Sequence, residues 1–440
     1  MTTALSVFGL GYVGCVSSAC FAKEGHRVIG VDVSPAKVDM INNGRATIVE
    51  SGIGELIAEM VSAGRLTATT DAAAAVLASD VSLVCVGTPS RSNGSIDLRY
   101  VERVCEEIGA AIKSKVPRHT VVIRSTVLPG TVQRIVIPAL EAASGKKAHQ
   151  DFGVCMNPEF LREGTSIRDF YEPPFTLIGT DDRTTADVVS ALYAGLDAPA
   201  HVTSTAVAEM IKYTCNCFHG LKVGFANEVG NICKVFGVDS HEVMRIFCLD
   251  TKLNLSPAYL RPGFAFGGSC LPKDLRAITY HARANDVETP ILSATLDSNQ
   301  RQIERAYEMV RAAGSRNVGV LGLAFKAGTD DLRESPMVSV VEMLIGKGAN
   351  LAIYDRDVSE ARLIGANREY IEREIPHVWS LMRGTVDEVI DCSEVIVIGN
   401  GSGEFRLIEP KLRPGQVVID LVRAFGDRTS NGDGYRGICW

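Results

Sequence analysis

A cysteine in a glycine-rich loop is the residue of this chain best suited to nucleophilic chemistry. Cys270 follows two glycines and a serine within residues 261–274, and Pro272 after it is typical of a first helical turn. The glycines let the backbone approach a ligand closely. Amide N–H groups at a helix N-terminus, with Lys273 nearby, favour the thiolate over the thiol, and Asp274 is close enough in sequence to handle water or a proton.

A second set of residues, near the N-terminus, fits a dinucleotide. The pattern G-x-G-x-x-G at residues 9–14 lies between a predicted strand, 5–8, and a predicted helix, and the next predicted strand, 28–32, ends in Asp32. The first glycine would make a tight turn, the second would admit a pyrophosphate and the third would let helix and strand pack closely. Asp32 can accept hydrogen bonds from both ribose hydroxyls and would repel a 2′-phosphate, which favours NAD over NADP. The alternative is a glycine-rich turn needed only for packing. The residues predicted to bind the cofactor here are Gly9, Gly11, Tyr12, Val13, Gly14, Asp32 and Lys37.

Polar residues also follow three further predicted strands, 81–86, 120–124 and 153–156. Thr88 and Thr126 would lie at the carboxyl edge of a parallel sheet, where ligands of such sheets bind, so we expect them to contact the cofactor. Each could also simply cap a helix. After the third strand, the loop 157–164 carries two carboxylates that could transfer protons, or could be a solvated loop with a capping glutamate. These carboxylates are Glu159 and Glu163.

A long proline-free stretch, residues 205–236, has a helical pattern. Four of its polar residues fall within roughly 80° of one another at 100° per residue, among largely apolar neighbours. Such a stripe indicates a face turned toward a ligand, because a solvated face would carry more charged residues. The four residues are Lys212, Asn216, His219 and Asn227.

Strand–turn units resume in the last third, after a second predicted helix, 289–313. The third glycine of the fingerprint is missing, so a different nucleotide-containing ligand is more plausible here than a second dinucleotide. Lys326 and Arg333, in a loop rich in charge, could bind phosphate or carboxylate, although surface ion pairs explain such charges equally often. The polar stretch 427–435 predicts an exposed loop. The strands predicted in this part are 317–325, 351–355, 395–399 and 416–420.

Composition excludes several classes of function. The 440 residues predict two or three domains, and 46% hydrophobic with 22% charged residues is ordinary for a soluble globular protein. A net charge of −7 argues against a nucleic-acid partner. Apolar runs fall far short of the ~18 residues that span a bilayer, and no signal peptide is visible. The scattered cysteines lack metal-site spacing and fit a reducing compartment, so we expect a cytoplasmic protein without metal or membrane partner.

Together these motifs resemble the nucleotide-sugar 6-dehydrogenases, the UDP-glucose/GDP-mannose dehydrogenase family, along the whole chain. The loop 267–274, Gly-Gly-Ser-Cys-Leu-Pro-Lys-Asp, is highly specific to them. Residues 261–266 and the ending 437–440 are similar to the branch that acts on GDP-mannose. One departure is Ala258, which precedes Tyr259 where that branch carries two tyrosines.

The resemblance implies an α/β fold of two Rossmann-like doubly wound parallel-sheet domains, joined by a helical middle domain with a long connecting helix. The implied domains are an NAD-binding domain, 1–202, a central dimerisation domain, 203–300, and a C-terminal nucleotide-sugar-binding domain, 301–440. A homodimer or higher homo-oligomer is expected, in which a substrate site can borrow Arg261 from the partner.

The resemblance also implies a four-electron oxidation of the C6 hydroxyl of GDP-mannose to a carboxylate, with two NAD consumed in turn, feeding mannuronate polymers such as alginate. Chemical logic separately requires the cysteine, because an aldehyde must become a tetrahedral adduct before it can lose a second hydride. Attack by Cys270 gives a thiohemiacetal and then a thioester. By the family's pattern, Lys212 and Asn216 stabilise the oxyanion, Glu163 and Asp274 assist proton transfer or water activation, and Lys273 and Arg333 contact the cofactor. The expected substrate contacts are Glu163, Lys212, Asn216, His219, Asn227, Tyr259, Arg261 and Lys326.

Three alternatives stay open. The nearest is the same reaction on a UDP-sugar. Another is a two-electron dehydrogenase that uses Lys212 as its base and keeps Cys270 for packing, which would release one NADH per substrate in place of two. The third is a non-catalytic NAD-binding redox sensor with Cys270 as its thiol.

Overall fold

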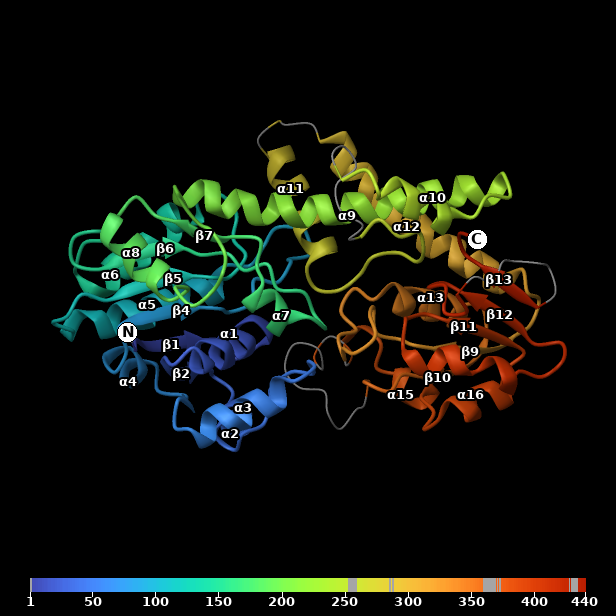
Figure 1. The fold of residues 1–440 in the computed structure, drawn as a ribbon, viewed down its shortest axis with the longest axis horizontal. Coiled ribbons are helices and arrows are strands. Elements are labelled where there is room, and N and C mark those ends of the chain that lie inside the picture. The colour runs from blue at the N-terminus through green and yellow to red at the C-terminus, as the bar shows by residue number, and fades with distance from the viewer. Residues whose placement is uncertain are drawn as a thin grey trace. The chain divides into compact units, whose positions relative to one another are not determined.

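The chain forms two compact units, Met1–Cys215 and Asn216–Trp440, here called the N-terminal and the C-terminal unit (Figure 1). The computed structural model describes residues 2–251, 259–284, 286, 289–358, 369, 371, 373–426, 428 and 434–440. Ala258, the departure from the GDP-mannose branch, lies outside these residues. The expected domain bounds at 202 and 300 stay a prediction.

The N-terminal unit is built on an eight-stranded sheet with the order β3-β2-β1-β4-β5-β6-β7-β8. All neighbouring strands are parallel except β6 and β7. The strand order reverses next to β1, which pairs with both β2 and β4, and ligands of such sheets bind at the carboxyl ends of the strands at this point. The strands are β1 Ala4–Phe8, β2 Arg27–Val31, β3 Leu66–Thr69, β4 Val81–Val84, β5 Thr120–Ile123, β6 Gly153–Met156, β7 Thr176–Gly179 and β8 Ala200–Thr203.

Helices cover both faces of this sheet, because successive residues of its central strands point to opposite sides. In β1, Leu5 and Val7 belong to one apolar core and Phe8 to the other. The sequence predicted this doubly wound pattern. The helices are α1 Tyr12–Lys23, α2 Pro35–Asn42, α3 Ile53–Ser62, α4 Ala72–Leu77, α5 Arg99–Ser114, the π-helix Val132–Val136, α6 Ile137–Ser144, α7 Ser166–Tyr171, α8 Arg183–Ala191 and the start of α9 Thr205–Val235.

The C-terminal unit contains a five-stranded parallel sheet with the order β10-β9-β11-β12-β13. Tyr435, which the sequence placed at the end of an exposed loop, is instead buried at the start of β13, so that expectation was wrong for this residue. The strands are β9 Asn317–Leu321, β10 Asn350–Tyr354, β11 Val395–Ile398, β12 Val417–Asp420 and β13 Tyr435–Gly437. The helices that complete the unit include α10 Ser240–Phe247, α11 Leu271–Ala284, α12 Pro290–Arg311, α13 Pro336–Ile345, α15 Val378–Leu381 and α16 Val386–Cys392.

These two sheets, with the 31-residue helix α9 between them in the chain, confirm the predicted fold class. The predicted strands begin and end within a few residues of the observed ones. The long stretches predicted as helices at 205–236 and 289–313 correspond to α9 and α12.

A buried polar chain crosses β1, β4 and the start of β5. The hydroxyls of Ser6 and Ser82 lie 2.7 Å apart, and Ser82 Oγ lies 2.7 Å from His119 Nε2. Lys115 Nζ lies 2.9 Å from His119 Nδ1. Because an ammonium can only donate, we infer that His119 is neutral and carries its proton on Nε2. Burial, together with the Lys115 charge, lowers the pKa of His119 to about 3.

We expect acid to destabilise the N-terminal unit through His119. Its folded pKa of about 3 lies below the ordinary 6.5, so its contribution to stability is complete above pH 6.5 and is lost as the pH falls toward 3. Lowering the pH from about 7.5 to about 5 should reduce the free energy of unfolding by about 2 kcal/mol through this residue. Hydrogen exchange of β4 and β5 amides measures it. His119→Gln should remove this part of the pH dependence, whereas His377→Gln, at an exposed position, should leave it intact.

Candidate active site

The three glycines of the first turn meet different constraints. Gly9 has a φ of +94°, which other residues resist. A Cβ on Gly14 would lie 1.7 Å from the carbonyl oxygen of Gly9, so this position must lack a side chain for α1 to pack against the turn. A Cβ on Gly11 would meet no atom within 4 Å. Gly11 precedes α1, and no side chain caps the helix there, so the amides of its first turn can bind an anion.

The carboxylate of Asp32, just after β2, is buried beside this turn. Its Oδ2 accepts a hydrogen bond of 2.7 Å from the amide of Leu10, and its Oδ1 accepts one of 2.9 Å from the amide of Ser34. Lys37 Nζ lies 3.3 Å from Asp32 Oδ2. The acid predicted to bind ribose therefore also fixes the glycine turn, and Lys37 lies where the adenosine side of a dinucleotide is expected.

The hydroxyl residues that follow β4 and β5 are brought together at the carboxyl edge. Thr88 Oγ1 donates a hydrogen bond of 2.9 Å to the carbonyl of Thr126. Ser125 Oγ donates one of 2.6 Å to the carbonyl of Val86. The two loops predicted to face the cofactor are thus joined to each other by side-chain hydrogen bonds.

A buried ion pair joins α9 to the loop after β6. Lys212 Nζ lies 3.0 Å from Glu159 Oε1, and the two side chains are only 5% and 7% exposed. Glu159 Oε2 also accepts a hydrogen bond of 2.8 Å from the amide of Leu161. The sequence made both carboxylates of this loop candidates for proton transfer, and Glu163, the one expected to act, is half-buried. Only the structure shows that Glu159 is the partner of Lys212.

Cys270 in the C-terminal unit immediately precedes α11, where its carbonyl accepts the first helical hydrogen bond, of 2.8 Å, from the amide of Asp274. Asp274 is fully buried. Its Oδ1 lies 3.1 Å from Lys273 Nζ, and its Oδ2 accepts a hydrogen bond from Asn216 Nδ2. Three predicted residues from two separate parts of the sequence, Asn216 and the neighbours Lys273 and Asp274, therefore form one contact group at the start of the helix that follows the thiol.

Amide side chains hold the loop that leads to Cys270. Asn227 Oδ1 accepts a hydrogen bond of 2.8 Å from the amide of Gly263, and its Nδ2 donates one of 3.0 Å to the carbonyl of Phe264. Asn299 makes the same pair of bonds, 2.8 and 2.9 Å, with the amide and carbonyl of Phe266. Asn227 was predicted to bind substrate, which stays a prediction, and its described contacts position the loop. Asn299 was not predicted, because nothing near it in sequence marks it.

Gly267 and Gly268 are also required for packing. A Cβ on Gly267 would lie 2.4 Å from Cδ of Pro336, and one on Gly268 would lie 2.8 Å from the ring of Phe325. Gly268 has a φ of +85°, a turn that other residues resist. These glycines therefore let the cysteine loop pack against the segment 325–336, and their expected close approach to a ligand stays a prediction.

The remaining predicted residues of the C-terminal unit form an ion pair, stack on another ring or are exposed. Arg333 Nε and Nη2 donate hydrogen bonds of 2.9 and 2.7 Å to the carboxylate of Asp331. The ring of Tyr259 stacks on the imidazole of His219, with ring centres 4.7 Å apart. Arg261 and Lys326 are exposed.

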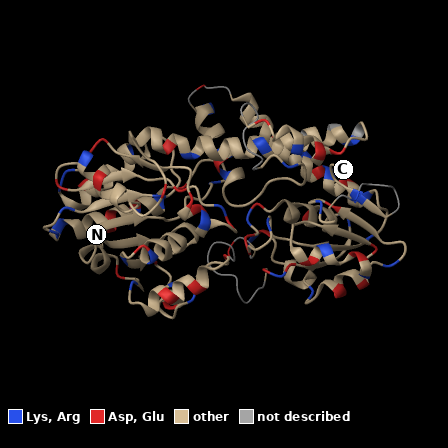
Figure 2. Ribbon diagram, in the orientation of Figure 1, with Lys and Arg blue, Asp and Glu red and all other residues tan. Residues whose placement is uncertain are grey.

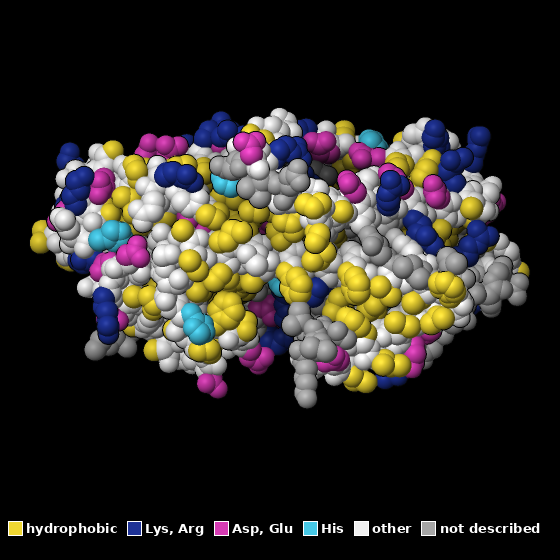
Figure 3. Space-filling model, turned by 90° about the horizontal axis from the view of Figure 1, so that it is seen from above, with side chains coloured by type: hydrophobic (Ala, Val, Ile, Leu, Met, Phe, Trp, Pro, Cys, Tyr) yellow, Lys and Arg dark blue, Asp and Glu magenta, His cyan; other side chains and the backbone are white. Residues whose placement is uncertain are grey.

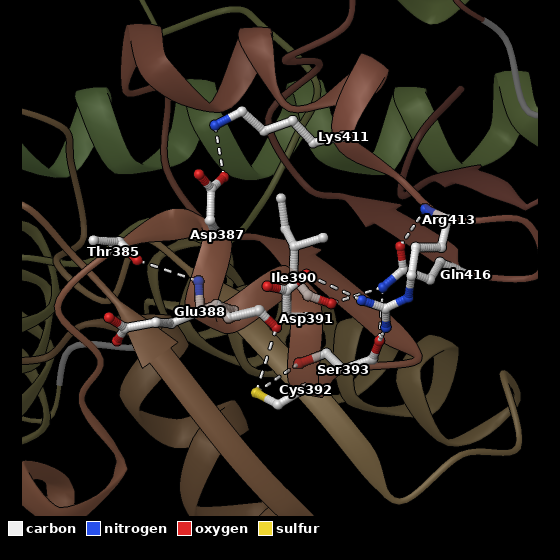
Figure 4. Close-up of polar contacts among 11 residues, drawn as sticks. Thr385, Asp387, Glu388, Ile390, Asp391, Cys392, Ser393, Lys411, Arg413 and Gln416 are labelled. Atoms are coloured by element: carbon white, nitrogen blue, oxygen red, sulfur yellow. Dashed lines mark hydrogen bonds and ion pairs between the residues drawn. The ribbon is translucent and has the colours of Figure 1, made fainter.

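Two cysteines in the described part of the chain are exposed, Cys270 and Cys392. Cys392 is the last residue of α16, and its thiol donates a hydrogen bond of 3.6 Å to the carbonyl of Val389, a contact that only the protonated form can make (Figure 4). The contacts of Cys392 with its neighbours in α16 indicate a role in packing and not in catalysis. Figure 4 also shows Gln416 Nε2 donating bonds of 2.8 and 2.7 Å to the carbonyls of Ile390 and Ser393, which fix the end of α16. Cys270 immediately precedes a helix, where the helix N-terminus favours the thiolate, so it is the exposed cysteine better suited to act as a nucleophile.

Comparison with known proteins places the chain. The UDP-glucose/GDP-mannose dehydrogenase family matches it in three parts: the NAD binding domain over residues 3–197, the central domain over 206–301 and the UDP binding domain over 319–427. A GDP-mannose 6-dehydrogenase of Pseudomonas aeruginosa is 56% identical over 436 residues, which is 99% of this chain and 100% of that protein. The chain belongs to the UDP-glucose/GDP-mannose dehydrogenase family.

Solved structures agree. The crystal structure of a ternary complex of GDP-mannose dehydrogenase from Pseudomonas aeruginosa shares 55% identity over 99% of this chain and 100% of that chain, with a TM-score of 0.57. The structure of a UDP-glucose dehydrogenase from Pyrobaculum islandicum shares 37% identity, covers 100% of this chain and 98% of that chain, and has a TM-score of 0.90. As a member of this family, the chain is an NAD-dependent nucleotide-sugar dehydrogenase. The glycine turn, the uncapped start of α1 and Asp32 fit NAD.

In the described ranges, no three His, Cys, Asp or Glu side chains are grouped so as to hold a metal ion. Among the same residues, no helix is both long and apolar enough to cross a membrane. Acidic and basic residues are interspersed along the ribbon of each unit (Figure 2).

A matched pair of substitutions separates packing from cofactor binding in this family member. Gly14→Ala should lower the free energy of unfolding by about 2 kcal/mol or more, because its Cβ would overlap the Gly9 carbonyl. Gly11→Ala should change stability by less than about 1 kcal/mol, yet weaken NAD binding about tenfold or more, because the new methyl group enters the space for the pyrophosphate. Thermal unfolding and calorimetric NAD titration measure the two effects. Unchanged NAD affinity in Gly11→Ala would contradict this placement of the cofactor.

Proposed function

We propose that this chain oxidises the C6 hydroxyl of GDP-mannose to a carboxylate, giving GDP-mannuronate for polymers of the alginate type. The observation that carries the chemistry is the exposed thiol of Cys270 at the start of α11, beside the contact group Asn216–Lys273–Asp274. The choice of sugar nucleotide rests on the 56% identity to a GDP-mannose 6-dehydrogenase, against 37% to a UDP-glucose dehydrogenase.

The first half of the reaction turns the alcohol into an aldehyde. NAD, when bound in the glycine turn, supplies a hydride acceptor for C6, and it does so twice per substrate. Glu163 and Asp274 receive the protons that are released. Lys212 and Asn216 donate to the C6 oxygen wherever it carries negative charge. The buried Glu159 keeps Lys212 in place and balances its charge.

Cys270 makes the second oxidation possible. Its sulfur forms a bond to the aldehyde carbon, and the carbonyl electron pair moves to the C6 oxygen, giving a thiohemiacetal. Loss of hydride leaves a thioester, and water then breaks the C–S bond and returns the thiol. The balance is one alcohol, two NAD⁺ and one water giving one carboxylate, two NADH and three protons. A simple alcohol dehydrogenase would stop after the first NADH.

Three residues of the C-terminal unit, the half-buried Tyr259 and the exposed Arg261 and Lys326, would bind the nucleotide sugar. Tyr259, Arg261 and Lys326 present an aromatic ring and two cations, which suit a base, a sugar and a diphosphate. His219 supports the ring of Tyr259. Asn227 contributes by holding the arginine loop, and Lys273 and Arg333 remain our proposed cofactor contacts.

Counting NADH tests the mechanism. With GDP-mannose and NAD, the native protein should release two NADH per GDP-mannuronate, measured by absorbance and product chromatography. Cys270→Ser should lower formation of the acid at least ~10³-fold and at most reach the aldehyde level, because an alcohol side chain is a poor nucleophile and leaving group. Cys392→Ser, the other exposed cysteine, should match the native protein. One NADH per product, or faster turnover of UDP-glucose than of GDP-mannose, would overturn the proposal.

We also propose a homodimer or higher homo-oligomer through the outer face of α9. Phe218 and Phe225 on α9, and Phe236 just after it, are 40%, 45% and 76% exposed. The spacing of seven residues keeps Phe218 and Phe225 on one side of α9, and Phe236 follows the last residue of this helix. Hydrophobic side chains are visible on the face of the molecule seen in Figure 3. A second copy of the chain, which presents the same self-complementary stripe, is the partner that such a face fits.

Phe225→Asp should therefore dissociate the oligomer, because a carboxylate in an apolar interface pays a large desolvation cost. Light scattering coupled to gel filtration measures the mass. Leu407→Asp, at a position that is 70% exposed in the same unit but away from α9, should leave the mass unchanged. A native mass of one chain would contradict the proposed assembly.

A further inference from the structure

The segment between α2 and α3 contacts two loops that are far apart in sequence. Thr47 Oγ1 donates a hydrogen bond of 2.7 Å to the carbonyl of Leu10 in the glycine turn. Glu50 is 8% exposed. Its Oε2 accepts hydrogen bonds of 2.8 Å from the hydroxyl of Tyr12 and 2.7 Å from the amide of Gly164, and its Oε1 accepts one of 2.9 Å from the amide of Ser166.

One buried carboxylate thus serves three donors from two different loops. Burial, with the added effect of the hydrogen bond to Glu50, raises the pKa of Tyr12, so its hydroxyl stays protonated and keeps donating. Gly164 has a φ of +85°, so the backbone at this point takes a form that a side chain would resist. Two carboxylates therefore hold this loop: Glu50 at the amides of Gly164 and Ser166, and Asp169 at the amide and side chain of Arg162.

We propose that Glu50 is a positioning residue that couples the dinucleotide turn to Glu163. Tyr12 is the first residue of α1, on the turn that fits the pyrophosphate, and Glu163 is the chain neighbour of Gly164. A cofactor that fixes Tyr12 also fixes Gly164, because both donate to the same oxygen of Glu50. The loop that contains Glu163 should then become less mobile when NAD binds. This coupling needs no substrate, and only its catalytic consequence rests on the proposed function.

Glu50→Gln isolates the carboxylate with little change in shape. A glutamine has one acceptor oxygen and an NH₂ group that can only donate. Two donors face Oε2 and one faces Oε1, so either orientation of the amide sets its NH₂ against an N–H or O–H group. A buried donor is then left without an acceptor, which is costly. Glu55→Gln, an exposed position in the first turn of α3, makes the same chemical change without these contacts.

Limited trypsin digestion reports the loop directly, because Arg162 is exposed and its peptide bond to Glu163 lies beside Gly164. In the native chain, saturating NAD should slow cleavage at this bond about tenfold. In Glu50→Gln, cleavage without NAD should be about tenfold faster than in the native chain, and NAD at saturation should slow it less than about twofold. Calorimetry should show NAD affinity within about fivefold of native, since the glycine turn itself is intact.

The control and the catalytic readout complete the test. Glu55→Gln should keep native protection by NAD and native turnover. Glu50→Gln should lower kcat about tenfold while the KM for NAD changes less than about threefold, a division that mere loss of the cofactor site would not give. Native NAD protection in Glu50→Gln, or equal loss of protection in Glu55→Gln, would overturn the coupling. If the native chain fails to oxidise GDP-mannose, the proposed function fails, and the digestion result still decides the role of Glu50.

Discussion

Buried side chains accept hydrogen bonds from backbone amides of the loops that carry the proposed chemistry. The same arrangement appears in both units. Asp32, after β2, accepts from the amide of Leu10, and Asp355, after β10, accepts from the amides of Leu323 and Ala324 at 2.7 and 2.9 Å. Each carboxylate fixes the turn after the neighbouring strand. Because buried amides must be paired, these acids are as necessary to the turns as the glycines are.

The turns after β1 and β9 nevertheless differ in the space they leave for a ligand. In the N-terminal unit the space beside Gly11 is open. In the C-terminal unit Gly322 takes the place of Gly9, with a φ of +92°, and the place of Gly11 is taken by Ala324, whose side chain is fully buried. The second turn thus carries a buried methyl group where the first has no side chain. This agrees with the absence of the third fingerprint glycine and with our proposal that this unit binds a different nucleotide.

The sequence predicted the central strands and long helices well, because their apolar residues alternate or repeat at helical spacing. It missed β3, β7, β8 and β13. The first three residues of β8 are exposed, and β13 has three residues and lies at the sheet edge. Such short strands are defined by their neighbours in the sheet more than by a local pattern. Likewise the roles of Glu159, Asn299 and Glu50 arise from contacts with distant residues, so no nearby motif marks them. The packing role of Gly267 and Gly268 was missed for the same reason, since it comes from Phe325 and Pro336.

The buried pair Glu159–Lys212 has a consequence for how such a chain can diverge. Replacing either residue alone would remove one member of a buried ion pair, which is usually costly, so we expect changes at one position to favour changes at the other. Arg261 and Lys326 are exposed, and substitutions at exposed positions usually cost less stability. Substitutions should therefore be tolerated better at the positions we propose for sugar-nucleotide choice than at the ion pair. New substrate preferences could evolve on this scaffold while the reaction itself stays the same.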